Sequence, residues 1–181
     1  MNMVVRSSRP RAARAVLCGS YRRDIDGLQR AYDELAATGC QVLSPRRVEF
    51  MGGEFVVDAA EVGLSPREIE SWHLRAIEQS DFILLHAPKG YVGISAAMEI
   101  GYALALKRPI FSRTAPVDTM LRELVYVVPS VYDALHLGIS ELINRFTPIT
   151  CMGVYNKVYE QINDDSKTGS LPTAWRRYVR P

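Results

Sequence analysis

A glycine-bearing stretch in the middle of the chain contains the glutamate best placed to do chemistry. Residues 90–103 read GYVGISAAMEIGYA, with Gly93 in a loop and Glu99 about one turn into the helix expected after it. A loop that joins a strand to a helix offers free backbone N–H groups to an anion. Glu99 either faces a ligand or is a solvated helix glutamate, and spacing alone leaves both interpretations open. Ser95, near the helix start, is either a helix cap or a ligand for a phosphate or sugar hydroxyl.

The loop after the first apolar run of the chain offers a second group of candidate ligand residues. It follows Cys18 and contains, in order, Gly19, Ser20, Tyr21 and Arg22. An aromatic ring there can stack on a base, and a guanidinium can pair with a phosphate. The same residue types also suit an ordinary surface loop, so the residues alone do not decide between the two. Cys18 itself is expected to be a small core residue at a buried strand end, not a nucleophile.

The elements that must position these residues alternate between short apolar runs and amphipathic stretches. Strands are predicted at 15–18, 41–43, 82–87, 109–111 and 124–128, and helices at 24–38, 66–80, 95–107 and 134–146. This alternation predicts an α/β fold, a single open, mostly parallel five-stranded sheet with helices on both faces (Rossmann-like). The runs 15–18 and 82–87 are expected to be neighbouring central strands. Ligands of such sheets sit at the carboxyl ends of the strands.

Composition and length place the chain among soluble proteins of one domain. Its 181 residues are 48% hydrophobic and 23% charged, with a net charge of +2. The basic ends are interpreted as solvated tails, and no basic stripe is interleaved with aromatics between them, so a nucleic-acid partner is not indicated. We expect a disordered basic leader at 1–14, the main domain at 15–148 and a partly helical C-terminal extension at 149–181. The stretch 46–64 has no clear period and is expected to be a functional or mobile loop.

Cysteine usage and hydropathy indicate a cytoplasmic protein. Cys18, Cys40 and Cys151 are widely spaced and odd in number, and no paired spacing suggests zinc or a redox dithiol. The charged start of the chain is not followed by an apolar run of signal-peptide length, and no segment approaches the length of a membrane span. We therefore expect no membrane partner, and we find no pattern that calls for a metal or an organic cofactor.

Three blocks of sequence together resemble the nucleoside 2-deoxyribosyltransferase family. Residues 96–103, AAMEIGYA, are followed by KRPI at 107–110. CGSYR at 18–22 is similar to the first-strand loop of the 2'-deoxynucleoside 5'-phosphate N-hydrolase branch, and AIEQSDFI at 76–83 is similar to the strand that carries the family's acidic residue. The blocks agree with the family in order and spacing. The resemblance covers roughly residues 15–148 and implies that they form a catalytic domain with the fold of that family.

The resemblance also implies an N-glycosidic reaction and a role for each candidate residue. Glu99 would attack the anomeric carbon and form a glycosyl-enzyme ester, which water or a second base then opens, as in a retaining glycosidase. Asp81 would orient the site or assist proton transfer to the base. Tyr21 and Arg22 occupy the positions of sugar- and base-contacting residues. The implied partner is a nucleoside or nucleoside 5'-monophosphate, cleaved by hydrolysis or by transfer.

Two positions depart from the family pattern. Gly93 stands where the N-hydrolase branch has a serine that holds the 5'-phosphate, so backbone N–H groups and Ser95 would have to replace it. His73 stands where the family often has an aspartate, eight residues before Asp81. A histidine there can hydrogen-bond a substrate, titrate near neutral pH, or pack as an ordinary helix residue. The preferred base, the sugar and the need for a phosphate therefore stay open.

The resemblance further implies a homodimer or a higher homo-oligomer, because members of the family close their sites with a neighbouring chain. The candidate contact surfaces are the aromatic-rich segment 125–132 and the tail near Tyr155 and Tyr159.

Two other functions remain open at this point. One is a phosphoribohydrolase of the lysine-decarboxylase-like group, whose Pro-Gly-Gly-x-Gly-Thr loop also precedes a helix glutamate. Residues 88–93, PKGYVG, match that loop only loosely, and the group's early arginine motif is missing. The other is a non-catalytic nucleotide sensor with the same fold. The presence of both Glu99 and Asp81 argues against it.

Overall fold

The protein folds around a five-stranded sheet in which every paired strand is parallel. The computed structural model describes residues 11–48 and 61–146, with side chains to residue 140. The strands lie in the order β2-β1-β3-β4-β5. Their bounds are β1 (Arg14–Gly19), β2 (Gln41–Ser44), β3 (Phe82–His86), β4 (Ile110–Ser112) and β5 (Tyr126–Val127). This confirms the predicted α/β class and the neighbouring interior strands β1 and β3.

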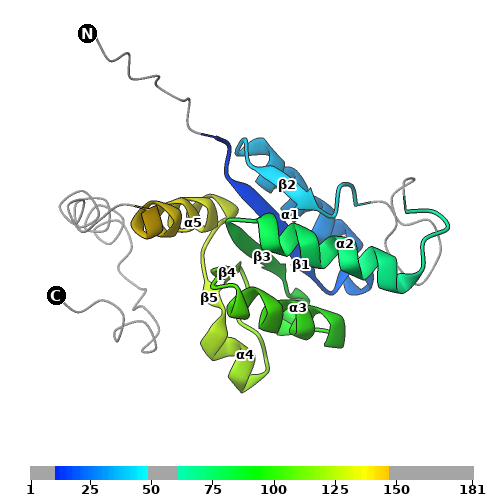
Figure 1. The fold of residues 1–181 in the computed structure, drawn as a ribbon. Helices are drawn as coiled ribbons and strands as arrows, with labels where there is room; N and C mark the ends of the chain where they lie inside the picture. Colours follow the sequence, from blue (N-terminus) through cyan, green and yellow to red (C-terminus); the bar gives the residue numbers. More distant parts are fainter. Residues whose placement is uncertain (1–10, 49–60, 147–181) are drawn as a thin grey trace, which may run out of the picture.

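Helices cover both faces of the sheet (Figure 1). The α-helices are α1 (Ile25–Ala37), α2 (Pro66–Gln79), α3 (Ile94–Ala105), α4 (Thr119–Leu124) and α5 (Val131–Phe146), with single 3-10 turns at Tyr21–Arg23 and Pro88–Gly90. Because successive strand side chains point to opposite faces, Leu17 and Leu84 pack with α1 and α5, whereas Val16 and Leu85 pack with α2 and α3. Among the described residues, no helix has the length and apolar character to cross a membrane.

Local signals in the sequence set most of the helix ends. Ser65 and Glu68 form the predicted capping box at the start of α2, and Gly39 follows α1 with a φ of +79°, a conformation that favours glycine. The prediction of the last strand, 124–128, is wrong in extent, because Leu124 belongs to α4. This short helix was not predicted, and Asp118 caps it. The first ten residues, most of the 46–64 loop and the C-terminal extension lie outside the described residues.

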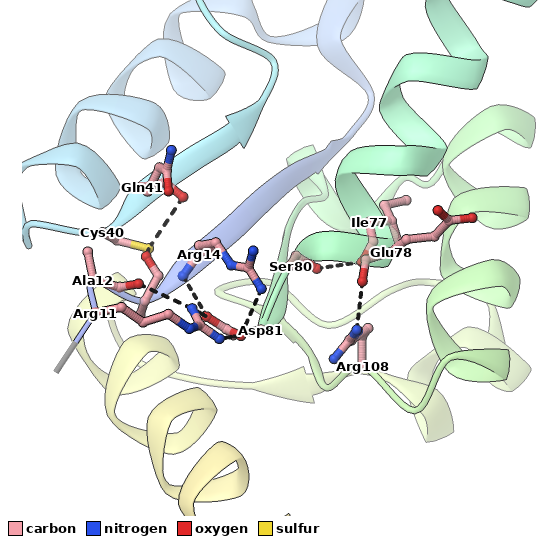
Figure 2. Close-up of polar contacts among 11 residues, drawn as sticks. Arg11, Ala12, Arg14, Cys40, Gln41, Ile77, Glu78, Ser80, Asp81 and Arg108 are labelled. Carbon is pink, nitrogen blue, oxygen red and sulfur yellow. Dashed lines mark hydrogen bonds and ion pairs between the residues drawn. The ribbon is translucent and has the colours of Figure 1, made fainter. Parts of the chain in front are cut away.

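Asp81 lies at the amino end of β3, at the opposite end of the sheet from the ligand-binding edge. Its carboxylate accepts two hydrogen bonds from the Arg11 guanidinium, each 2.7 Å, and one of 2.8 Å from the backbone N–H of Arg14 (Figure 2). The backbone N–H of Asp81 donates in return to the carbonyl of Arg14, at 2.7 Å. These contacts fasten the segment that leads into β1 to the start of β3, across about 70 residues of chain.

This placement corrects the catalytic role expected for Asp81. β3 ends at His86, five residues after Asp81, so at roughly 3.3 Å a residue the two positions lie about 16 Å apart. A carboxylate at the amino end cannot transfer a proton to a base bound at the carboxyl end. Burial by itself raises the pKa of Asp81, but the hydrogen bonds from Arg11 and Arg14 outweigh it and hold the pKa below its usual value. The role of Asp81 is therefore structural.

We predict that Asp81→Asn lowers the free energy of unfolding by about 1–2 kcal/mol at pH 7, the range for hydrogen bonds to a charged group when one partner is half exposed. Because the folded pKa is depressed, this contribution is present above the unfolded pKa of about 3.9 and is lost as pH falls through the folded value. Urea unfolding of the parent and the variant at pH 7 and at decreasing pH measures it. The control Asp33→Asn, on the exposed face of α1, should change stability by less than about 0.5 kcal/mol, and an equally small effect of Asp81→Asn would contradict the prediction.

Candidate active site

A cavity of about 440 Å³ opens where the carboxyl ends of β1 and β2 meet α2 and the start of α3. This is the edge at which open parallel sheets bind ligands, because the loops after the strands converge there. Apart from Asp81, every candidate site residue named from the sequence lines it: Gly19, Ser20, Tyr21, Arg22, His73, Gly93, Ser95 and Glu99.

Glu99 is buried at the base of this cavity. Its flanking apolar residues anchor α3 on the sheet, with Ile100 and Ala103 both 1% exposed or less, so the carboxylate is held inward and Glu99 is only 8% exposed. Oε2 lies 3.4 Å from Nε2 of His73 and has no hydrogen-bond partner. Burial by itself raises the pKa of Glu99, but His73 and Cys18 outweigh it and leave the pKa below the usual value. The structure thus excludes the solvated helix glutamate and places an ionised carboxylate in the cavity.

His73 connects three elements at the floor of the cavity. It comes from α2 and is 9% exposed. Its Nδ1 lies 2.7 Å from the hydroxyl of Ser44 at the end of β2, and its Nε2 lies 3.3 Å from Sγ of Cys18 at the end of β1. Burial lowers the pKa of His73, but the adjacent Glu99 carboxylate outweighs it and raises the pKa overall. The raised pKa of His73 and the lowered pKa of Glu99 both favour the charged forms, an imidazolium beside a carboxylate.

Cys18 is fully buried, as expected for a core residue, yet it also contacts the site. Burial and the nearby charge of Glu99 raise the pKa of its thiol well above the usual value. The thiol is the weak form of the nucleophile, and the thiolate is the reactive one. The raised pKa favours the protonated thiol, so Cys18 is a poor candidate for a nucleophile.

Glu70 is one of the site residues that the sequence analysis missed, with Ser44, Glu61 and Tyr91. It lies three residues before His73 on α2 and lines the same cavity, with a buried Oε1 that has no hydrogen-bond partner. Burial and the charge of Glu99 raise the pKa of Glu70. The spacing of three residues puts Glu70 and His73 on one face of a helix, and this is the signal that would have found it. Two carboxyl groups with pKa values displaced in opposite directions thus share one cavity.

The loop after β1 is fixed against β3 and α3. Gly19 has a φ of +140°, and a Cβ there would lie 2.1 Å from the carbonyl oxygen of His86, so only glycine fits. The backbone N–H of Ser20 donates to that same carbonyl, and the Ser20 hydroxyl accepts from the N–H of Gly93 at 3.1 Å. The Tyr21 hydroxyl donates to the carbonyl of Leu17. Tyr21 therefore offers a ring surface to a ligand, while its hydroxyl is already engaged.

A second cavity, of about 910 Å³, opens on the α1 side of the carboxyl ends of β3 and β4. Arg23 and Tyr91 line both cavities, and the Arg23 guanidinium carbon stacks 3.6 Å from the centroid of the Tyr91 ring. The acidic side chain in its lining is Asp24, half-exposed and paired at 3.3 Å with His86. Although this cavity is larger, no pair of carboxylates lines it among the described residues, whereas Glu99 and Glu70 both line the smaller cavity.

Comparisons with known proteins give distant structural similarity and no sequence match. No family model matches the chain, and no curated protein matches its sequence. Among solved structures, the chain is similar to a CMP N-glycosidase, BcmB, from Clostridium botulinum, with 17% identity and a TM-score of 0.45 over 68% of this chain and 94% of that one. It is also similar to a 2-deoxyribosyltransferase from Bacillus psychrosaccharolyticus, with 19% identity and a TM-score of 0.49 over 68% of this chain and 90% of that one. At such identities the activity of this chain has to be argued from its own site.

Proposed function

We propose that this chain is an enzyme that cleaves the N-glycosidic bond of a nucleoside or nucleoside 5'-monophosphate, with Glu99 as the nucleophile. The observation that carries the proposal is the pair of carboxyl groups in one cavity, Glu99 with a lowered pKa and Glu70 with a raised one. Glycosidic cleavage needs one ionised carboxylate to meet the cationic sugar and one protonated carboxyl to protonate the leaving group. The sequence block around Glu99, which resembles nucleoside 2-deoxyribosyltransferases, supports the same reaction class.

In the first step, a carboxylate oxygen of Glu99 forms a bond to the anomeric carbon as the bond from that carbon to the base nitrogen breaks. The base leaves with the electron pair, and the proton of the Glu70 carboxyl passes to it. In the second step, water or a second base attacks the anomeric carbon, the Glu70 carboxylate takes the proton of the attacking group, and the ester bond to Glu99 breaks. His73 keeps Glu99 ionised and positioned, and its positive charge favours the return of the carboxylate in the second step.

The cavity has the size and lining that such a substrate requires. Its volume of about 440 Å³ falls within the range of small-molecule sites. Tyr91, 40% exposed, offers a ring to a base, and the exposed Arg22 offers a cation to a phosphate. Gly93 starts α3 without a side-chain cap, so the first N–H groups of the helix, with the Ser95 hydroxyl, can take the place of the serine that the sequence lacks. Ser95 and Arg22 are therefore proposed as the phosphate subsite.

The assembly remains a prediction. Val127 and Tyr132, in the predicted contact segment, are 50% and 61% exposed, so they are accessible for a second copy of the chain. The other predicted contacts, Tyr155 and Tyr159, lie outside the described residues.

We predict that Glu99→Gln lowers the rate of base release by several orders of magnitude, about 4–8 kcal/mol of activation free energy, because the amide keeps the shape but cannot form the ester. The measurement is free base released from a panel of nucleosides and their 5'-monophosphates. The matched control is Glu123→Gln, on exposed α4, which should keep parental turnover. Retention of a tenth of the parental rate by Glu99→Gln would rule out this nucleophile. Binding without base release by the parent would favour a nucleotide sensor instead.

A second prediction separates the acid from the nucleophile. Glu70→Gln should slow release of ordinary bases about 10²–10⁴-fold, because the leaving nitrogen loses its proton donor. A nucleoside analogue whose base leaves as a stable anion needs no such proton, so the variant should cleave it at close to the parental rate. Equal losses on both substrates would show that Glu70 is not the general acid.

A further inference from the structure

The cluster at the floor of the cavity has a second chemical property that the N-glycosidic reaction does not use. Cys18, His73 and Glu99 each offer one ligand atom, and these atoms all lie within 4.8 Å of one another. All three side chains are buried, and they come from β1, α2 and α3. Among the residues that the structure describes, these three are the only cysteine, histidine or acidic side chains that lie close enough together as a group to bind one ion.

The spacing of the ligand atoms fits a tetrahedral metal centre. Thiolate, imidazole and carboxylate bind zinc at about 2.0–2.3 Å, so in tetrahedral geometry neighbouring ligand atoms lie about 3.3–3.6 Å apart. Here Sγ of Cys18 lies 3.3 Å from Nε2 of His73, which lies 3.4 Å from Oε2 of Glu99. The side chains therefore need little rearrangement to bind one ion. Because His73 and Glu99 line the cavity, the fourth position opens toward it.

Two further observations indicate a ligand at this point. Oε2 of Glu99 is buried without a hydrogen-bond partner, on a side chain that is only 10% exposed. Nδ1 of His73 is held 2.7 Å from the Ser44 hydroxyl, the outer contact that orients metal-binding histidines, and Nε2 lies between Cys18 and Glu99.

We infer that Cys18, His73 and Glu99 form a binding site for one thiophilic divalent cation, with Zn²⁺ as the best fit, and that this cation inhibits the enzyme by occupying Glu99. On binding, the Cys18 thiol and the His73 imidazolium each lose one proton to solvent, and Sγ of Cys18 and Nε2 of His73 form bonds to the metal in place of those protons. The resulting thiolate and the Glu99 carboxylate carry two negative charges, which the divalent cation offsets inside the protein. A thiolate with an imidazole selects zinc, and Mg²⁺ and Ca²⁺, which prefer oxygen ligands only, are excluded.

The binding stands on geometry alone, whereas the inhibition rests on the proposed function. A carboxylate bound to a metal ion cannot attack an anomeric carbon, and a metal in the floor of the cavity fills the space that the sugar would need. The expected result is a reversible block: one Zn²⁺ per chain stops base release, and a chelator restores it.

Binding is tested on the full, chelator-treated chain with Co²⁺ as a spectroscopic probe. The parent should bind one Co²⁺ and show a thiolate-to-cobalt charge-transfer band with the visible bands of tetrahedral cobalt. Cys18→Ser should lose the charge-transfer band and bind at least about tenfold more weakly. The matched control is Cys40→Ser, the other buried cysteine described, whose thiol donates to the carbonyl of Ala13 at the far end of the sheet. It should behave as the parent does.

A second variant keeps the test valid if Cys18→Ser does not fold. Glu99→Gln should weaken Co²⁺ binding while the charge-transfer band survives at saturation. Absence of the band in the parent, or an unchanged band in Cys18→Ser, would overturn the site. If the parent binds Co²⁺ but releases no base, the proposed function fails and the site stands. If base release is unaffected by bound Zn²⁺, or requires it, the inhibitory role is overturned.

Discussion

The contact between His73 and Glu99 is the interaction on which the site depends. Two buried groups of opposite charge each need the other, because an isolated charge in this position would be strongly destabilised and would lose its ionisation. Their 3.4 Å separation joins α2 to α3 across the carboxyl end of the sheet, and Ser44 and Cys18 fix the imidazole from the other two sides. By this argument the pair adds little to the free energy of unfolding, but it sets the charge and the orientation of Glu99, the proposed nucleophile.

The two ends of the sheet perform different tasks. At the amino ends of the strands, Arg11 and Asp81 hold β1 and β3 together through charge-assisted hydrogen bonds. At the carboxyl ends, the glycine at position 19 allows β1 and β3 to approach closely, and the polar groups there remain without full hydrogen bonding. Buried polar groups without hydrogen bonds destabilise the folded state, so each of them calls for an explanation, such as a ligand that supplies the missing hydrogen bond.

The residues at the floor of the cavity take part in two proposed processes that exclude each other, N-glycosidic cleavage and metal binding. With the Cys18 thiol protonated, Glu99 faces His73 and is free to act on a sugar. When a thiophilic ion takes the proton's place on sulfur, the carboxylate becomes a metal ligand and the nucleophile is lost. Metal binding does not involve Glu70. This residue lines the cavity three residues before His73 on α2, but it does not belong to the cluster of Cys18, His73 and Glu99.

The sequence determined the α/β class, the parallel strands β1 and β3 in the interior, and about half of the residues that line the cavity, because apolar periodicity, glycine stops and capping residues act locally. It also pointed to Glu99, through its place after a glycine-bearing loop. Only the tertiary structure decided which acidic residues meet. Asp81 and Glu99 lie near one another in the chain, yet β3 separates them by its full length. Cys18 carried no local signal of function, and Glu70 carried only its spacing from His73, because burial, pKa and contact across 55 residues arise only when strands and helices pack together.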